Sequence, residues 1–591
     1  MNSFSLPSFA SQPLTPTCLS EFDYGDVQFD NCLQQEQLDH SLSVIMGLSD
    51  DEMLKPLRQH AGVAAPGKDL GGWYDEFAGY DFRHSIERGF APAHSLGQWI
   101  SALARGYAIS GSKPMQEKVH TLIQGYAAIP QVKAYAGLRF PAYTYDKLVC
   151  ALLDASKWAQ CPDAFDILNK MTDEVVPLLP EKALDHDEMR ARPHIDEPFC
   201  WDESYTLPEN LFIAYERGAG ERYKKLAMQY LKDDTYFDPL SEGKNVLPGH
   251  HAYSYFNALN SSIKAYMVTG SDKHFRAAKN AFDFIQSSQS FATGGWGPNE
   301  TFVTPGTGGL YDSLLNTHSS FETPCGAFAH FKLTRYLLRV TGDTKYGDSM
   351  EQVMYNTVLG AKPLLPDGRH FYYSDYNFSA TKFYKPIVWA CCSGTLPQVA
   401  VDYRINTYLR APGSIYVNLY IPSSVRWLHE GAQVKLAQSG SYPFEQQVRF
   451  GITASRPVRF AVKLRIPAWA GDGATVQVNG KRIKEPVVAG SFASVEREWK
   501  TGDRIELELP LRKRLVAIDE QHPDVVALMQ GPLVLFPITM TEPKVTREQL
   551  LASKQFRRGQ WRTETHEGSL CFLPFTSIDQ ENYSTYLHVT A

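Results

Sequence analysis

The sequence predicts a mostly helical toroid followed by β-sandwich structure. Up to about residue 405 the apolar residues keep a helical period, and after it short runs alternate with a period of two. A glycine-centred segment also recurs between the predicted helices. Because 591 residues are too many for a single core, we expect two to four domains.

The N-terminal 30 residues are rich in Ser, Pro and Thr, which predicts an irregular arm over residues 1–30. A helical domain is then expected over residues 31–405. Within it, Leu96, Ile100, Leu103 and Tyr107 are spaced by four, three and four residues, which indicates a helix with one apolar face.

The recurring segment consists of an apolar helix end, a glycine, a short polar turn and a second amphipathic helix. Its glycines are Gly111, Gly218, Gly270 and Gly342. A glycine after the last helical turn can adopt the left-handed conformation that caps free carbonyls, so each copy predicts a helical hairpin. Several hairpins in succession favour a closed toroid with a central cavity, with an ordinary multi-helix bundle as the alternative.

The alternating runs predict short strands in the C-terminal third. They cover residues 414–421, 458–466, 475–480 and 504–509, and are bounded by Gly, Pro and Asp. We expect one or more β-sandwich domains over residues 406–545. Residues 546–591 are expected to form a β or irregular C-terminal extension.

The composition and the terminal sequence argue against several partners and cellular locations. A net charge of −7 argues against nucleic acid as a partner and gives no basic patch for an anionic membrane. The N-terminus has no secretory signal pattern, and no segment has the length and apolar character of a membrane span. Nine cysteines without regular spacing favour a reducing compartment, so we expect a cytoplasmic protein, for which a homodimer is one allowed assembly.

Two adjacent cysteines, Cys391 and Cys392, are the most informative feature. Neighbouring Cα atoms lie about 3.8 Å apart, whereas disulfide-bonded cysteines need about 4.4–6.8 Å. The pair is therefore expected to remain as thiols, followed by a small turn at residues 393–395. Two thiols at one point suit a soft metal or a nucleophile. The alternative is two small apolar residues buried side by side.

Two glutamates and a third cysteine extend this candidate site. Glu322 and Cys325 are three residues apart at an expected helix entrance, where they would share a helix face. With Cys391 and Cys392 they offer one oxygen and three sulfur donors, a set that suits tetrahedral zinc. Glu300 lies in a Gly-rich loop over residues 293–302, a place for a closely approached acid or for an ordinary solvated carboxylate.

Ordered motifs across residues 65–540 resemble one known family. They include Gly71-Gly-Trp73, His94-Ser-Leu-Gly-Gln-Trp-Ile-Ser-Ala102, Gly249-His-His251-Ala, Glu300-Thr-Phe302, Glu322-Thr-Pro-Cys325, Cys391-Cys392-Ser-Gly-Thr395, Leu464-Arg-Ile-Pro-Ala-Trp469 and Gly531-Pro-Leu-Val534. The chain resembles the DUF1680 superfamily, glycoside hydrolase family 127 and its relative family 146, whose characterised members are β-L-arabinofuranosidases. The resemblance implies an (α/α)6 barrel followed by β-sandwich domains.

The resemblance also implies roles for individual residues. It assigns a zinc ion to Glu322, Cys325, Cys391 and Cys392, the nucleophile to Cys391 and the general acid/base to Glu300, so that Glu322 also belongs to the catalytic set. Such an acid works best with its pKa raised towards neutrality. The expected activity is that of a retaining hydrolase releasing a terminal furanose-type sugar, similar to L-arabinofuranose, from a short oligosaccharide or glycoside.

This sequence departs from the family pattern at three points. The family spaces its Glu and Cys as Glu-x-Cys, but here the spacing is Glu-x-x-Cys. One extra residue rotates a side chain by about 100° on a helix, so either the local backbone compensates or the fourth ligand is lost. Gln98 and Asp146 each stand where the family has a histidine, so the sugar need not be L-arabinofuranose.

Five residues are candidates for binding the sugar: His94, Asp146, His250, His251 and Trp73. Each could instead have a packing or surface role. Residues 196–197 and 201–205 resemble an acidic, aromatic loop at a cavity mouth, for which a solvated loop is the simpler expectation. Two other functions stay open: a polysaccharide lyase acting on uronate-containing oligosaccharides, and a non-catalytic carbohydrate-binding zinc protein.

Overall fold

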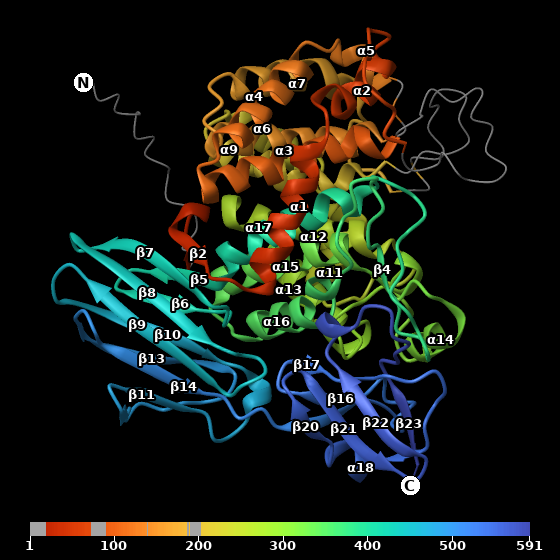
Figure 1. The fold of residues 1–591 in the computed structure, drawn as a ribbon. Helices are drawn as coiled ribbons and strands as arrows, with labels where there is room; N and C mark the ends of the chain where they lie inside the picture. Colours follow the sequence, from red (N-terminus) through yellow and green to blue (C-terminus); the bar gives the residue numbers. More distant parts are fainter. Residues whose placement is uncertain are drawn as a thin grey trace.

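A computed structural model describes residues 19–71, 90–136, 138, 140–185, 188 and 202–590. The helices fill the first two thirds of the chain and lie above two β-sheet units formed by the last third (Figure 1). The predicted change in secondary structure near residue 405 is confirmed, because the last long helix ends at Thr407 and the next strand starts at Tyr408.

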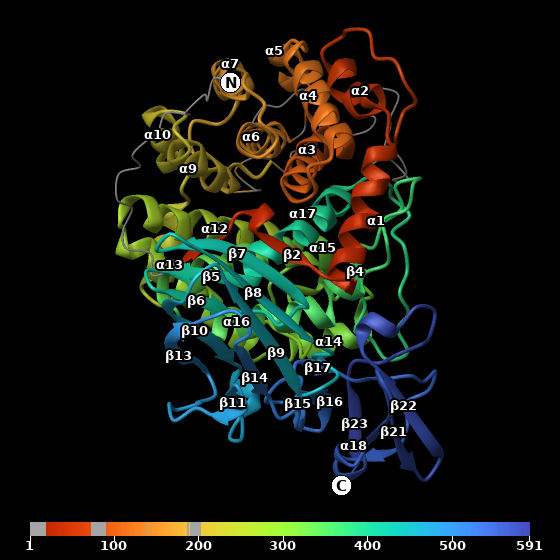
Figure 2. The same cartoon turned by 60° about the vertical axis from the view of Figure 1, so that its left-hand side comes forward.

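Six inner helices form a closed ring. Each contacts the next, and the last contacts the first, so their labels follow one another around the ring in Figure 2. These helices are α3 (Phe90–Ser110), α6 (Pro141–Lys157), α9 (Pro208–Glu216), α12 (Ala252–Thr269), α15 (Thr323–Thr341) and α17 (Cys391–Thr407). The predicted toroid is therefore confirmed as an (α/α)6 barrel, and the ordinary multi-helix bundle is excluded.

An outer layer of helices covers this ring. In the order of the inner helices from α3 to α15, the outer partners are α4 (Lys113–Ala127), α7 (Ala164–Val175), α10 (Glu221–Gln229), α13 (Asp272–Ser288) and α16 (Lys345–Asn356). The partner of α17 is α1 (Leu33–Gly47), from the start of the chain. The barrel is thus closed by pairing its first and last helices. The remaining described α-helices of this domain are α2 (Asp50–His60), α5 (Gln131–Ala136), α11 (Asp238–Ser241) and α14 (Gly309–Asn316).

Glycines allow the hairpins to turn as predicted. Gly270 and Gly342 cap α12 and α15 in the left-handed region, with φ of 76° and 69°. The other two predicted turn glycines, Gly111 and Gly218, also have positive φ. These conformations are strained for residues that carry a Cβ, and this explains the repeated glycine.

The described part of the expected irregular arm is ordered, which corrects the prediction for residues 19–30. Strand β1 (Ser20–Glu21) pairs with β5 (Tyr408–Ala411), and β2 (Val27–Phe29) pairs with β7 (Ser423–His429). The arm therefore adds a strand to each sheet of the first β unit. Composition could not show this, because edge pairing uses backbone groups that every residue carries.

Charged residues fix this arm against one end of the barrel. Glu21 bonds to Arg335 and Arg339 of α15 at 2.9 and 2.8 Å. Asp402 of α17 accepts a hydrogen bond from the Tyr24 hydroxyl at 2.7 Å and from Arg105 of α3 at 2.9 Å. A buried ionic network thus links the C-terminal halves of three inner helices to the arm.

The first β unit contains two sheets. One has the order β1-β5-β6-β10-β13 and the other β12-β11-β14-β9-β8-β7-β2. The strands not yet given are β6 (Ser414–Val417), β8 (Ala432–Gly440), β9 (Gln447–Ala454), β10 (Val458–Ile466), β11 (Thr475–Val478), β12 (Lys481–Arg482), β13 (Ser491–Trp499) and β14 (Arg504–Glu508). Every run predicted from alternation contains one of these strands.

A second β unit occupies residues 513–590. Its sheets have the orders β15-β16-β23-β19, with β17 beside β16, and β18-β22-β21-β20. The strands are β15 (Lys513–Ala517), β16 (Val525–Gln530), β17 (Leu533–Val534), β18 (Phe536–Pro537), β19 (Val545–Thr546), β20 (Lys554–Arg557), β21 (Gln560–Thr565), β22 (Gly568–Leu573) and β23 (Leu587–Thr590), with helix α18 (Arg547–Leu551). Residues 546–590 are therefore no separate extension, because they pair with strands that precede residue 545.

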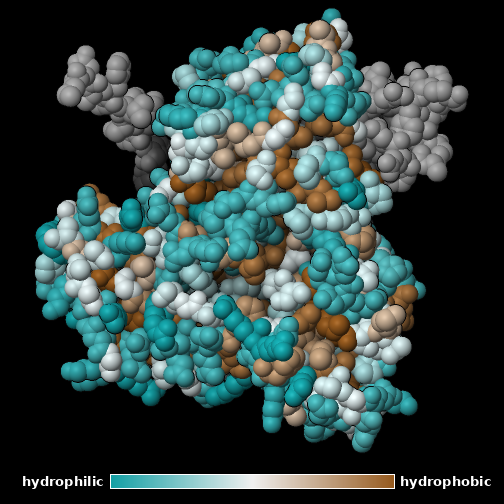
Figure 3. Space-filling view, viewed as in Figure 1, coloured by the Kyte–Doolittle hydropathy of each residue, from teal (hydrophilic) through white to brown (hydrophobic). Residues whose placement is uncertain are grey.

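The face of the molecule in Figure 3 is largely hydrophilic over both β units and over the upper helices. Among the described helices, none combines the length and the apolar composition needed to cross a bilayer.

A fully buried ion pair joins the barrel to the first β unit. Arg465 of β10 bonds to Glu351 of α16 at 2.9 Å, and neither side chain is exposed to solvent. Arg465 also bonds to Asp348 of α16, while the Tyr442 hydroxyl donates to Glu351 at 2.7 Å. Removing the guanidinium would leave two carboxylates without their counter-charge.

We expect Arg465→Met to lower the free energy of unfolding by about 3–5 kcal/mol, because breaking a buried pair leaves an uncompensated charge. Arg459→Met, on the same strand, removes an exposed pair with Glu496 and should cost less than about 1 kcal/mol. Urea unfolding followed by circular dichroism measures both. Equal losses in the two variants would contradict the proposed role of burial.

Candidate functional site

The cysteine pair begins α17, the last inner helix of the barrel. Cys391 is the first residue of α17, and all 17 residues of this helix are buried. Both cysteines are free thiols, as their spacing predicted. The expected turn at residues 393–395 is instead the first turn of α17. A Cβ on Gly394 would lie 2.4 Å from the Gln98 side chain, so glycine lets α17 pack closely against α3.

Glu322 approaches the cysteines in a different way from the one predicted. It belongs to the short strand β3 (Phe321–Glu322), which pairs with β4 (Tyr373–Ser374), and it precedes α15 with an extended backbone. Because Glu322 is outside the helix, the extra residue before Cys325 causes no helical rotation of the ligand. Glu322 and Cys325 therefore do not share a helix face, contrary to the prediction, and the extended backbone before α15 compensates for the extra residue.

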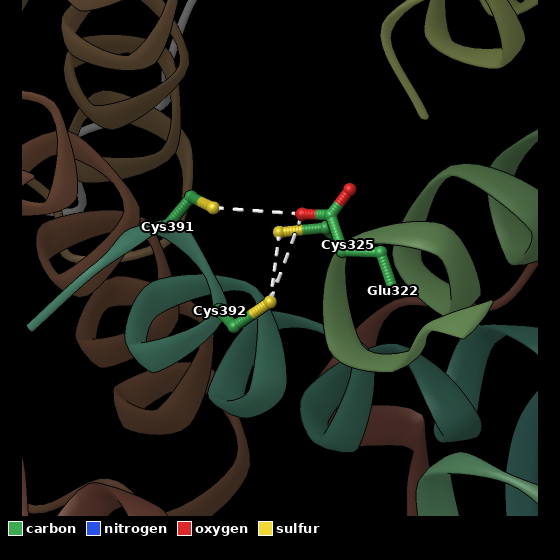
Figure 4. A group of neighbouring side chains, drawn as sticks. All are labelled: Glu322, Cys325, Cys391 and Cys392. Carbon is green, nitrogen blue, oxygen red and sulfur yellow. Dashed lines mark hydrogen bonds between the residues drawn. The ribbon is translucent and has the colours of Figure 1, made fainter. Parts of the chain in front are cut away.

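The four predicted metal donors converge in one buried cluster (Figure 4). Their donor atoms all lie within 4.8 Å of one another. Glu322 Oε1 is 3.6 Å from Cys391 Sγ and 3.8 Å from Cys392 Sγ, and Cys392 Sγ is 3.3 Å from Cys325 Sγ.

These separations fit one tetrahedral ion. Zinc–sulfur bonds of about 2.3 Å and a zinc–oxygen bond of about 2.0–2.2 Å require separations of about 3.8 Å between sulfurs and 3.5 Å from sulfur to oxygen. The second carboxylate oxygen, Glu322 Oε2, is buried and accepts no hydrogen bond among the described residues. The cluster therefore suits a metal ion, and its sulfur-rich donor set is compatible with zinc.

The protonation of the cluster reflects crowding of like charges. Hydrogen bonds from Cys325 and Cys392 lower the pKa of Cys391 well below its usual range, and His94 lowers it further. Burial raises the pKa of Glu322 most, and the charge of the neighbouring Cys391 raises it further. Burial also raises the pKa of Cys325 and Cys392. Of the three thiols, Cys391 is thus the one that most readily ionises.

The position of Cys391 adds to this effect. As the first residue of α17, its thiol lies at the positive end of the helix dipole, which stabilises a thiolate. The preceding Trp389 has a left-handed φ of 55°, unusual for a bulky side chain. Its carbonyl accepts a hydrogen bond from Ser95 at 3.0 Å. Such backbone strain is found where a structure fixes a functional group.

Glu300 lies beside the cluster, held by a second strained segment. Asn299 and Glu300 both have positive φ, 53° and 56°. His251 Nε2 is 3.1 Å from Glu300 Oε2, and the Tyr373 hydroxyl donates to Glu300 Oε1. Donor atoms of His251, Glu300 and Glu322 lie within 4.8 Å of one another, so Glu322 connects the two groups.

The pKa of Glu300 is lowered, in contrast to the raised value expected for an acid. Burial raises it, but the hydrogen bonds from His251 and Tyr373 outweigh burial and favour the carboxylate. His251 caps α12 with Nδ1, which accepts from the Ser254 backbone N–H at 3.3 Å. In the neutral ring the proton is therefore on Nε2, facing Glu300.

A third carboxyl, Glu203, joins this group and was missed by sequence reasoning. The sequence favours a solvated loop here, yet Glu203 is 8 % exposed, with Oε1 3.9 Å from His251 Nδ1. Burial raises the pKa of Glu203 to about 7. The pKa of His251 is also raised: burial opposes the shift, but Glu300 and Glu203 outweigh it. The site thus holds protons near neutral pH. The neighbouring Asp202 caps α6 through the backbone of Ala142 and Tyr143.

The other sugar-binding candidates have different environments. His94 is buried beside Cys391 and packs edge-on against Tyr143. Asp146 is bonded to Lys147 at 2.7 Å and to Asn210 at 2.8 Å, which occupies both of its carboxylate oxygens. His250 instead stacks on Tyr255, with ring centroids 4.0 Å apart.

Trp73 and residues 196–201 lie outside the described residues. Tyr372, Tyr373 and Lys385 were not singled out from the sequence, although they surround Glu300 and Cys391. Adjacent aromatic residues in a chain with 12 % aromatics carry no distinguishing signal.

A closed ring of helices with a three-sulfur, one-carboxylate cluster at its N-terminal end defines an (α/α)6-barrel protein with a thiol-based candidate site. The chain matches the family model for the β-L-arabinofuranosidase GH127 catalytic domain over residues 26–403, and that for the GH127 middle domain over residues 414–511. This protein therefore belongs to glycoside hydrolase family 127.

Individual relatives are more distant. A non-reducing end β-L-arabinofuranosidase of Bifidobacterium longum is 23 % identical over 282 residues, 44 % of this chain and 41 % of the relative's own length. The crystal structure of a GH127 β-L-arabinofuranosidase from Geobacillus stearothermophilus T6 superposes with a TM-score of 0.73 at 17 % identity, covering 95 % of this chain and all of the other. A second GH127 β-arabinofuranosidase structure gives 0.73 at 18 % identity, covering 97 % and 98 %. These similarities support the fold.

We expect Tyr373→Phe to cost about 1.5–3 kcal/mol of unfolding free energy at pH 7, because it removes a hydrogen bond to a charged acceptor. Since the pKa of Glu300 is depressed, this stabilisation is present above the unfolded pKa and is lost as pH falls through the folded pKa. In thermal unfolding the difference from wild type should therefore be constant from pH 7 to about pH 5, and it should be smaller at pH 3, below the unfolded pKa of about 4.3, than at pH 7. Tyr416→Phe removes a hydroxyl bonded to Lys463 and should give a constant difference. An equal penalty for Tyr373→Phe at both pH values would contradict this account.

Proposed function

We propose that this protein is a retaining glycoside hydrolase that releases a terminal furanose-type sugar, similar to L-arabinofuranose, from a short oligosaccharide or glycoside. The observation that carries the proposal is the placement of Cys391, the most acidic thiol of the buried three-cysteine, one-glutamate cluster, beside the Glu300–His251 pair. Family membership supports the sugar class. The names of the Bifidobacterium longum and Geobacillus stearothermophilus relatives support the arabinofuranose assignment.

In the first step, the Cys391 thiolate attacks the anomeric carbon. A carbon–sulfur bond forms while the bond to the leaving oxygen breaks, and Glu300 delivers a proton to that oxygen. To act as the acid, Glu300 must first carry a proton, although its hydrogen bonds favour the carboxylate. Because His251 donates to Glu300 and Glu203 lies behind His251, we place the proton among these three groups.

In the second step, water replaces the leaving group. Glu300 removes a proton from the water, whose oxygen bonds to the anomeric carbon as the carbon–sulfur bond breaks. Two inversions at one carbon retain its configuration, and the thiolate is restored. The pKa of a thiol must be lowered for it to serve both as nucleophile and as leaving group at neutral pH.

Glu322, Cys325, Cys391 and Cys392 would hold a zinc ion. When bound, zinc would neutralise the crowded negative charges and keep the thiols deprotonated. The chain itself positions these donors by the extended backbone before α15 and the N-terminus of α17.

We expect Cys391→Ser to abolish turnover of both aryl and alkyl β-L-arabinofuranosides. Glu300→Gln should slow alkyl glycosides about 10²–10⁴-fold but affect a 4-nitrophenyl glycoside much less in the first step, because that leaving group needs little protonation. Single-turnover release of the leaving group separates the two steps. Wild-type rates in Cys391→Ser would exclude the sulfur nucleophile.

We expect the purified protein to bind about one zinc ion per chain. Cys392→Ala should lower this content by removing a donor, whereas Cys571→Ala, which changes an exposed thiol of β22, should leave it unchanged. Elemental analysis after dialysis against zinc measures the content, and circular dichroism shows whether each variant is folded. Full zinc content in a folded Cys392→Ala protein would refute the ligand set.

A further inference from the structure

Lys385 lies over two aromatic rings beside the candidate site. Its backbone N–H donates to the His370 carbonyl at 3.1 Å. Its Nζ is 4.6 Å from the ring centroid of Tyr372 and 4.3 Å from that of Tyr373. An ammonium group over an aromatic face is stabilised by the ring quadrupole, so the two tyrosines hold this charge in place.

The same two tyrosines reach the proposed acid and nucleophile with their hydroxyls. The Tyr373 hydroxyl donates to Glu300, and the Tyr372 hydroxyl is 3.8 Å from Cys391 Sγ. Burial lowers the pKa of Lys385, and Glu300 is the strongest of the negative charges that oppose this shift. Lys385 is therefore a half-buried cation next to the reacting groups, on the side of Tyr373 and Glu300.

The Lys385 ammonium has no acceptor among the described residues. Within those ranges, no carboxylate lies within 4.0 Å of Lys385 Nζ, and no hydrogen bond from it is formed. Buried lysines of this protein do have acceptors: Lys147 bonds to Asp146 at 2.7 Å, and Lys382 donates to three backbone carbonyls. A partly desolvated cation without an acceptor is costly, and a bound anion would offset that cost.

The position of this cation indicates which part of a substrate it would meet. Glu300 delivers its proton to the leaving oxygen, so the leaving group lies on the side of Glu300 and Tyr373. Resting on the function proposed above, we propose that Lys385 determines specificity by binding a carboxylate on the leaving group. Suitable substrates would be furanosides linked to a uronic acid or to a phenolic acid, which share this chemistry.

The test compares matched pairs of β-L-arabinofuranosides: the 4-carboxyphenyl glycoside with its methyl ester, and a glycoside of galacturonic acid with that of galactose. In each pair the ratio of kcat/KM is measured for wild type and for Lys385→Met. Comparing the ratios between proteins cancels differences in leaving-group reactivity.

We expect Lys385→Met to lower the acid-to-neutral ratio about tenfold or more in at least one pair, mainly through KM, with the neutral substrate little changed. Lys385→Arg should restore the ratio, because it restores the charge. A change confined to one pair identifies the source of the carboxylate. In wild type, added salt should lower the ratio as well.

Two outcomes would overturn the inference: an equal loss for acidic and neutral substrates, which indicates a structural role for Lys385, or an unchanged ratio. If folded, zinc-loaded wild type hydrolysed none of the four glycosides, the proposed function itself would fail. The wild-type rates therefore separate failure of the function from failure of the specificity assignment.

Discussion

The site depends on one electrostatic constraint: three thiols and a carboxylate are buried with their donor atoms within 4.8 Å. Four such groups cannot all be ionised at this distance unless a positive charge compensates them. The protein's own contribution is the hydrogen bonds that Cys391 receives from Cys325, Cys392 and His94, together with the N-terminus of α17. These make Cys391 the acidic member, and a cation in the cluster would extend the same effect to the others.

The closed ring gives its two ends opposite electrostatic characters. At the N-terminal ends of the inner helices lie Cys391, His251 and Glu322, where the helix dipoles favour negative charge. Towards the C-terminal ends lie Arg105, Arg335 and their acidic partners, locked by the N-terminal arm. The arm thus stabilises the end opposite the proposed catalytic groups. At the catalytic end, several residues have a strained backbone, and neighbouring ionisable side chains share protons.

Sequence patterns predicted where the helices and strands of this fold lie better than they predicted which strands pair and which side chains meet. The period of Leu96, Ile100 and Leu103 correctly predicted a helix, but the expected single apolar face was wrong. Residues 93–104 of α3 are all buried, because an inner helix of the ring is covered on every side. Residues 20–29 were missed because edge strands pair through backbone atoms. Glu203 was missed because a carboxylate in a polar loop gives no sign of burial.

The sequence by itself determined the order of helical and β domains, the free state of the cysteine pair and the identity of the four candidate metal donors. These follow from local chemistry: glycine at left-handed turns, Cα spacing across one peptide bond, and the donor types of Glu and Cys. Only the tertiary structure decided that Glu322 approaches from an extended strand, that the pKa of Glu300 is lowered, and that Lys385 stands over Tyr372 and Tyr373. Each of these depends on distances between groups far apart in the chain, which ring closure fixes and local pattern does not record.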